Sequence, residues 1–257
     1  MPKIAMVSYI NTRPFMDGFE QVFTEGEVDL QLLAPADCAK ALKRGEADMA
    51  LIPVGALSNF QHIKILPDFC IGAKGPVNSV FIFSKLPIER CDHIHLDPHS
   101  RSSNGLARIL LKHYWRKDLH IHSHTSRDFS RIKDHHAGVV IGDEAIRIRD
   151  QYPYQYDLSE HWYHLTGLGF PFAVWAFREE SFSPFLLRKI HHAMKVGVTQ
   201  RAQSAKKWAS YYKIDPEFAH TYLMDDIDFV FDQEKHKALK LYYKTLHALP
   251  AQELQRV

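Results

Sequence analysis

Apolar runs of strand length alternate with stretches of helical periodicity through the first half of the chain. The runs are residues 4–7, 28–33 and 48–52. Residues 36–44 between them have one apolar helical face, and Gly45 follows where a glycine commonly ends a helix. Strands and helices that alternate in this way are typical of βαβ units packed as a mostly parallel sheet. The pattern predicts the α/β fold class.

A second set of alternating elements follows residue 90. It comprises predicted strands at 93–97, 119–122 and 137–141 and predicted helices at 103–115 and 143–149. Leu106, Ile109 and Leu110 form an inward stripe on the first of these helices. Residues 78–85 read as a long strand that precedes the set. This second set predicts a separate lobe.

The chain turns mostly helical after a last strand-like run at residues 171–176. The predicted helices of the last third are 184–210, 216–224 and 233–247. We expect lobe I to contain residues 1–86 plus 177–257 and lobe II to contain residues 87–176. Two crossings between lobes, near 84–90 and 170–177, are typical of a hinged cleft.

Composition excludes several classes of function. The chain has 257 residues, 46% of them hydrophobic, which is enough for a full core. Its net charge of +2 provides no basic field for nucleic acid. No apolar run approaches the length of a membrane span. We therefore expect neither nucleic acid nor membrane as a partner.

Three scattered cysteines, Cys38, Cys70 and Cys91, are too few for a disulfide framework. The N-terminus begins a strand at once and carries no apolar signal segment. Both features favour a cytoplasmic protein.

A polar turn, Ser8 to Pro14, follows the first strand directly. Parallel strands of open α/β sheets bind small molecules at their carboxyl ends, so the turn is a candidate site. Its candidate residues are Ser8, Asn11 and Thr12. The alternative is structural, with Ser8 and Asn11 bonded to backbone groups and Thr12 capping the next helix.

Two further turns lie at the predicted edge of the second sheet. Ser102 and Ser103 open the helix after the strand at 93–97, and a helix N-terminus favours anions. Asp143 follows the strand at 137–141. Ordinary capping by these residues is the alternative. Together the turns indicate a small anionic ligand.

Histidine is abundant, at 17 residues, and His120, His122 and His124 alternate along a predicted strand. On one face of a strand they approach the spacing of metal ligands. No cysteine or acidic partner has matching spacing, so we favour a wet strand end and expect no metal. No P-loop, GxGxxG, GxSxG or HExxH motif is present.

Six segments, in order along nearly the whole chain, resemble the chorismate dehydratases of the futalosine route to menaquinone. They are VSYINTRP at 7–14, GEADMALIP at 45–53, NSV at 78–80, the stretch 96–103 with its helix, IGDEA at 141–145, and the stretch 156–168. One position departs from the family pattern: Gly169 stands where the family usually has proline.

The resemblance implies a two-lobed type 2 periplasmic-binding-protein-like fold with a central cleft and a helical C-terminal segment. It implies loss of water from chorismate to give 3-[(1-carboxyvinyl)oxy]benzoate, a lyase reaction that needs no cofactor. By position, Asn11 is the catalytic residue. Ser79, Ser102 and Ser103 would bind the substrate carboxylates, and Ser8, Thr12 and Asp143 would line the site.

Two other functions share this fold. A solute-binding protein for a small anionic metabolite normally has an export signal, which is not seen before the first strand. The sister dihydroxynaphthoate synthase carries a different, Ser-Pro-rich first turn. A ligand-sensing regulator is a weaker option, because no helix-turn-helix precedes the first strand. We expect a monomer or a homodimer.

Overall fold

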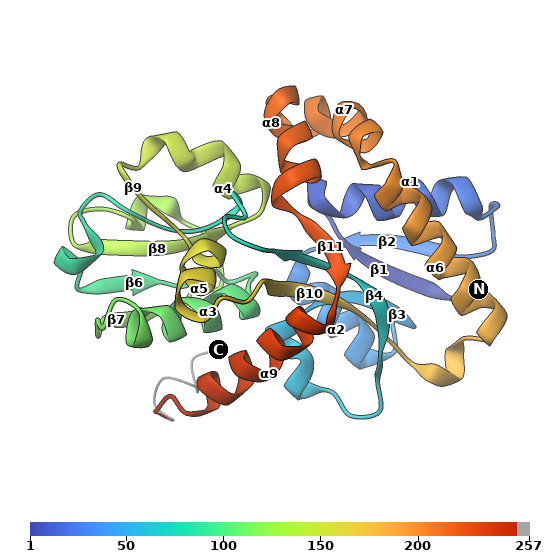
Figure 1. Cartoon of the computed structure of the whole chain (residues 1–257), viewed down its shortest axis with the longest axis horizontal. Helices are drawn as coiled ribbons and strands as arrows, with labels where there is room; N and C mark the ends of the chain where they lie inside the picture. Colours follow the sequence, from blue (N-terminus) through green and yellow to red (C-terminus); the bar gives the residue numbers. More distant parts are fainter. Residues whose placement is uncertain (251–257) are drawn as a thin grey trace. The chain divides into compact units, whose positions relative to one another are not determined.

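The computed structural model describes residues 1–250, which form two compact units. Unit 1 comprises Met1–Ile71 and Ala173–Phe231, and unit 2 comprises Gly72–Phe172 and the segment from Asp232 onward. Figure 1 shows that each unit has its own sheet and its own helices. The fold is the predicted two-lobed α/β architecture.

Unit 1 is built on a mixed sheet with the strand order β11-β4-β10-β3-β1-β2. The strands are β1 (Lys3–Val7), β2 (Asp29–Leu33), β3 (Met49–Pro53), β4 (Lys64–Ala73), β10 (Phe170–Phe177) and β11 (Asp228–Phe231). β1 pairs in parallel with β2 and β3, whereas β10 runs antiparallel to β3. The carboxyl ends of β1, β2 and β3 therefore share one edge.

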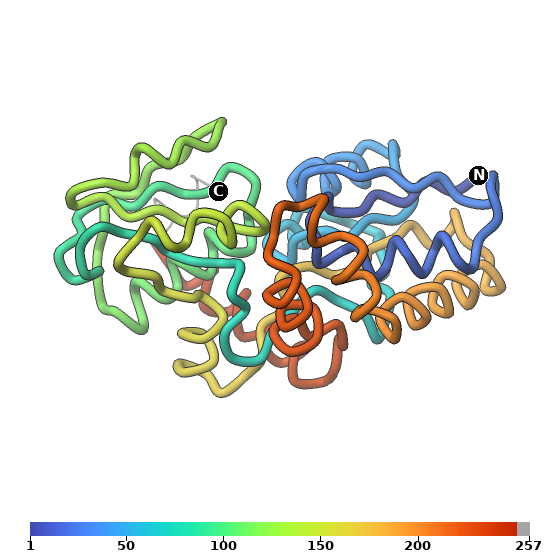
Figure 2. The backbone as a smooth tube through the Cα atoms, turned by 90° about the horizontal axis from the view of Figure 1, so that it is seen from above, coloured from blue at the N-terminus to red at the C-terminus, as the bar shows by residue number. Residues whose placement is uncertain are grey.

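Helices cover both faces of this sheet. They are α1 (Arg13–Val22), α2 (Pro35–Arg44), α6 (Pro184–Thr199), α7 (Arg201–Tyr212) and α8 (Pro216–Thr221). α2 ends at Gly45, whose φ of 74° is the expected left-handed cap. Figure 2 shows α6, in orange, beside α1, in blue. The two helices meet at Gly18 and Gly197, where a Cβ on either residue would collide with backbone of the other helix.

Unit 2 has a five-stranded sheet with the order β7-β6-β8-β5-β9. Its strands are β5 (Val80–Ser84), β6 (His93–His95), β7 (His120–His122), β8 (His136–Ile141) and β9 (Tyr154–Asp157). β6 is parallel to β7 and β8, and β5 is antiparallel to β8 and β9. Its helices are α3 (Arg101–His113), α4 (Asp143–Ile148), α5 (Leu158–Thr166) and α9 (Gln233–His247).

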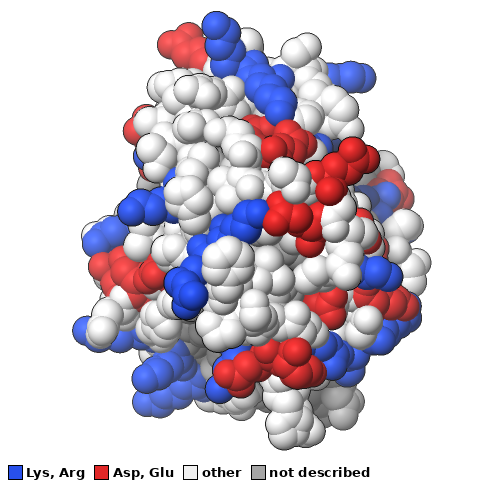
Figure 3. All heavy atoms as spheres, turned by 90° about the vertical axis from the view of Figure 1, so that its right-hand side faces the viewer, with Lys and Arg blue, Asp and Glu red and all other residues white. Residues whose placement is uncertain are grey.

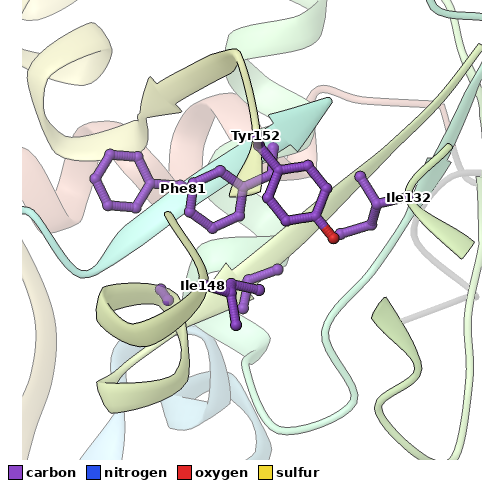
Figure 4. Close-up of a cluster of buried hydrophobic side chains, with 7 residues drawn as sticks. Phe81, Ile132, Ile148 and Tyr152 are labelled. Carbon is purple, nitrogen blue, oxygen red and sulfur yellow. The ribbon is translucent and has the colours of Figure 1, made fainter. Parts of the chain in front are cut away.

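One part of the unit 2 core is an aromatic and aliphatic cluster on β5 and β8 (Figure 4). The Phe83 ring stacks between those of Phe81 and Tyr152, with centroids 5.1 Å away on each side. Ile132 and Ile148 complete the packing around these rings. Packing within unit 2 thus fixes the position of β5. It also fixes the residues that come just before this strand.

The division into units differs from the predicted lobes. β5 was expected in lobe I, but it pairs with β8 and β9 in unit 2. α9 was also expected in lobe I, and it instead packs on α3 within unit 2. The chain consequently passes between the units after Ile71, after Phe172 and again after Phe231. The last of these passages was not predicted.

Gly169, which stands where the family usually has proline, uses its backbone N–H in a hydrogen bond. Its backbone N–H donates to Oε1 of Glu234 on α9, at 2.9 Å. Glu234 also pairs with Lys74, with 2.9 Å between Oε2 and Nζ. Because proline has no N–H, it would lose the bond that ties the start of β10 to α9.

The surface shows no single-sign field on the face drawn in Figure 3, where cationic and anionic side chains are interspersed. Within residues 1–250, no helix is long and apolar enough to cross a membrane. Cys38, Cys70 and Cys91 are buried, and none of them forms a disulfide within residues 1–250.

Candidate functional site

The first polar turn lies at the carboxyl edge of the unit 1 sheet. Ser8 N donates to Leu33 O at the end of the neighbouring strand, at 2.9 Å. A 3-10 turn, Ile10–Thr12, follows and leads directly into α1, with Pro14 in the first turn of that helix. Asn11 is 8% exposed and Thr12 is 1% exposed. The local sequence therefore places a nearly buried amide at the edge where parallel sheets bind ligands.

The Asn11 amide is held at both ends. Its Nδ2 donates to the Tyr222 hydroxyl at 3.1 Å, and its Oδ1 accepts from Thr12 Oγ1 at 3.3 Å. Thr12 makes no side-chain capping bond to α1, so the capping alternative for this residue is wrong. The Thr12 hydroxyl instead orients the asparagine.

Arg13 supports the same turn. Its guanidinium lies over the ring of Trp208, 4.1 Å from the centroid, and its Nε donates to the Tyr212 hydroxyl at 2.6 Å. Tyr212 in turn donates to the Ser8 carbonyl at 3.2 Å. A buried cation packed among aromatic rings is a strong structural contact. Arg13 thereby ties the turn to α7.

In unit 2, Ser79 and Asp143 are brought together by the antiparallel pairing of β5 and β8. Val80 pairs with Ile141, and Gly142 N donates to Ser79 O at 2.8 Å. Gly142 has φ 70° and ψ −153°, which only glycine adopts readily. Asp143 then begins α4 and is 5% exposed. No side-chain bond caps α4, so Asp143 is not its cap.

The start of α3 lies at the same edge of the unit 2 sheet, because β6 runs parallel to β8. Ser102 and Ser103 are each 2% exposed. The cap of α3 is Ser100, whose Oγ accepts from Ser103 N at 3.2 Å. Ser102 Oγ donates to Phe172 O at 2.8 Å, so its hydroxyl hydrogen already has an acceptor. Ser79, Ser103 and Asp143 thus share an edge with Ser102.

Asp157 is a residue that the sequence analysis missed. Its Oδ2 accepts from the backbone N–H groups of Val77 and Asn78, and its Oδ1 accepts from those of Ser159 and Glu160. Burial raises the pKa of this carboxyl to about 7 despite these four bonds. Asp157 therefore holds the segment that leads into Ser79.

The histidines of β7 belong to a larger cluster than predicted. In register, His93 lies between His120 and His136, and His95 lies beside His122. Ring nitrogens of His95 approach those of His124 and His136 at 2.8 and 2.9 Å. Within residues 1–250, no three His, Cys, Asp or Glu side chains are arranged to hold a metal ion. In this structure the imidazoles contact one another.

These features define a class of protein: two α/β units with the fold of periplasmic binding proteins, and polar turns at sheet edges. A Candida albicans protein described as having the generic periplasmic binding protein fold matches with a TM-score of 0.70 at 12% identity, over 100% of this chain and 94% of that one. An Archaeoglobus fulgidus protein matches with a TM-score of 0.77 at 16% identity, over 96% of each chain.

Sequence comparison identifies the family within this class. A family model described as menaquinone biosynthesis matches residues 2–248, and the chain belongs to this family. A relative from Thermus thermophilus, named chorismate dehydratase, is 26% identical over 208 residues. That match covers 74% of this chain and 76% of the relative.

Proposed function

We propose that this chain is a chorismate dehydratase, a carbon-oxygen lyase that forms 3-[(1-carboxyvinyl)oxy]benzoate. Its membership of the menaquinone biosynthesis family and its likeness to the Thermus thermophilus relative support the proposal. The structural observation that carries it is the Asn11 amide, nearly buried and held at both ends beside the carboxyl end of β1.

The reaction removes the C3 hydrogen and the C4 hydroxyl of chorismate. The electron pair of the C3–H bond becomes a ring double bond as the C4–O bond breaks. The proton and the hydroxide together leave as water. Asn11 is neutral and a poor base, so it orients the ring and donates an N–H to the departing hydroxyl. The substrate's own enolpyruvyl carboxylate, close to C3, takes the proton and then releases it, so that proton and hydroxide combine as water.

The two substrate carboxylates need donors. We assign the two carboxylates to the hydroxyls of Ser79 and Ser103 and to the N-terminal N–H groups of α3. Ser102 belongs to this first turn and would contribute its backbone N–H. Each charge-assisted bond contributes about 1.5 to 3 kcal/mol. Ser8, Thr12 and Asp143 line the site. The carboxylate of Asp143 suits a substrate hydroxyl better than a substrate carboxylate, because like charges repel.

None of the steps assigned here calls for a metal or an organic cofactor. With chorismate as its substrate, the chain would act in the cytoplasm, in keeping with its cysteine content. Its state as a monomer or a homodimer stays a prediction.

The test is turnover by purified protein treated with a chelator and then mixed with chorismate. We expect a product smaller than chorismate by one water, followed by chromatography and mass. Asn11→Ala should lower kcat by roughly 10²-fold, in the range seen on removing one transition-state donor. The exposed Asn59→Ala on the same unit is the matched control.

Two results would contradict parts of this proposal separately. Tight binding of chorismate without turnover would assign the chain to the solute-binding class. Turnover that survives in Asn11→Ala would leave the activity in place and remove the role given to Asn11.

A further inference from the structure

The C-terminal helical segment of unit 1, α6 to α8 and the turn after it, contacts the first polar turn as well as the sheet. Two tyrosines from it reach back to the first turn across about two hundred residues of sequence. Tyr212, at the end of α7, bonds to Arg13 and to the Ser8 carbonyl. Tyr222, just after α8, bonds to the Asn11 amide, 211 residues away. Only the second contact touches the proposed catalytic side chain.

Tyr222 occupies a rigid and unusual backbone position. It begins a π-helical turn, Tyr222–Asp226, which is closed by Ile227 N donating to Tyr222 O at 3.0 Å. Such turns are rare and are frequent at functional sites. The ring is fully buried and stacks on Phe218, with planes 14° apart. The hydroxyl is therefore held in one place by the packing of its ring.

This placement determines what Asn11 can offer. A primary amide has two N–H donors and one carbonyl oxygen. One N–H is engaged by Tyr222, and the oxygen accepts from Thr12. The amide plane is thereby set, and the direction of the second N–H is set with it.

We propose that Tyr222 is a positioning residue for the elimination, whose hydroxyl aims the second N–H of Asn11 at the leaving hydroxyl. The inference deepens the proposed function and rests on it. Tyr222 acts through Asn11 and makes no contact with the reacting atoms. The separate Arg13–Tyr212–Ser8 contacts hold the backbone of the turn, so loss of the Tyr222 hydroxyl leaves that backbone in place.

The first test is kinetic and uses Tyr222→Phe, which keeps the buried ring. We expect kcat to fall about three- to tenfold, the worth of one hydrogen bond, with KM within twofold of the wild type. In an Asn11→Ala background the same change should cost nothing further. Tyr211→Phe, an exposed tyrosine of α7, is the matched control.

The second test needs no turnover. In a ¹⁵N-labelled sample, the Asn11 side-chain amide is assigned by its loss in Asn11→Ala. Its resonance should shift in Tyr222→Phe and stay in place in Tyr211→Phe. If Tyr222→Phe folds poorly, Thr12→Val removes the other contact of the amide and should produce the same kind of shift and the same loss in kcat.

The outcomes separate the positioning role of Tyr222 from the proposed function. An unmoved amide resonance, an unchanged kcat in Tyr222→Phe, or an equal loss in the Asn11→Ala background overturns the positioning role. A wild type that turns over no chorismate overturns the proposed function, and with it the catalytic purpose of this contact, even where the amide resonance shifts.

Discussion

At the scale of single residues, one buried carboxylate supports two neighbouring structures. Asp157 ends β9 and bonds with one oxygen to the first turn of α5 and with the other to the backbone at Val77 and Asn78. Asn78 has a left-handed φ of 56°, an arrangement that costs energy for a non-glycine residue. The carboxylate offsets that cost and sets the backbone that carries Ser79.

Asp157→Asn should therefore lower both stability and substrate affinity. An amide has a single acceptor oxygen, so it can satisfy one pair of N–H donors and not the other. We expect a loss of about 1 to 3 kcal/mol in the free energy of unfolding, measured by urea denaturation, and a raised KM for chorismate. The exposed Asp150→Asn is the control. Equal stability of the two variants would contradict this account.

At the scale of elements, the histidine rows of β6, β7 and β8 make unit 2 sensitive to acid. Burial, and after it the neighbouring imidazoles and Arg131, lower the pKa of His95 to about 4. The pKa values of His122, His124 and His136 are also lowered, first by burial. The nearby acids Asp128 and Asp134 oppose this effect at His124 and His136.

The sign of the pH dependence follows from these shifts. Histidines of the unfolded chain take up protons below about pH 6.5, whereas folded His95 does so only near pH 4. The folded state with neutral His95 therefore has its full stability above pH 6.5, and it loses stability as the pH falls towards 4. The thermal midpoint should drop between pH 7 and pH 5, and His95→Phe, which keeps a ring but cannot titrate, should flatten the drop.

The exposed His220→Phe in unit 1 is the control for this measurement, which circular dichroism can follow. The thermal midpoint of His220→Phe should fall with decreasing pH as steeply as that of the wild type. A His95→Phe profile parallel to that of the wild type would mean that the cluster does not control acid stability.

The same scale shows what sequence patterns can predict. β1, β2 and β3 and the helix α2 were predicted to within about two residues, because their apolar patterns are regular and their boundaries are local. β4 was missed because exposed residues, Pro67 and the left-handed Asp68 interrupt its pattern. β11 was missed because it has only four residues, of which the first is Asp228, and Asp232 follows it directly. The predicted helix at 184–210 is two helices, which divide at Gln200, three residues after Gly197.

The sequence predicted those site residues that lie next to one another along the chain. The turn from Ser8 to Thr12 is visible because it follows its strand directly. Tyr212 and Tyr222 were not predicted as part of the site, because they meet that turn only through tertiary packing. Asp157 was missed for the same reason, since its partners at Val77 and Asn78 lie about 80 residues away. A single sequence carries no signal for such pairs.

At the scale of the whole molecule, each unit has its own sheet, core and polar turns, and three passages of the chain join the two units. Any ligand that binds the folded chain and not the unfolded one adds RT ln(1 + [L]/Kd) to its stability. Ligand-linked stability therefore tests substrate class without requiring turnover, and it separates recognition from chemistry.

We expect the product, 3-[(1-carboxyvinyl)oxy]benzoate, to raise the thermal midpoint. At a hundred times its Kd it adds about 2.7 kcal/mol, or roughly 5 to 10 °C for a chain of this size. 3-Hydroxybenzoate, which lacks the second carboxylate, should give a smaller shift at the same concentration. Ser103→Ala should reduce the product's effect because it removes a proposed carboxylate donor, whereas the exposed Ser210→Ala should not. Equal shifts from the two ligands would mean that the second carboxylate is not recognised, which would contradict the donor assignment in unit 2.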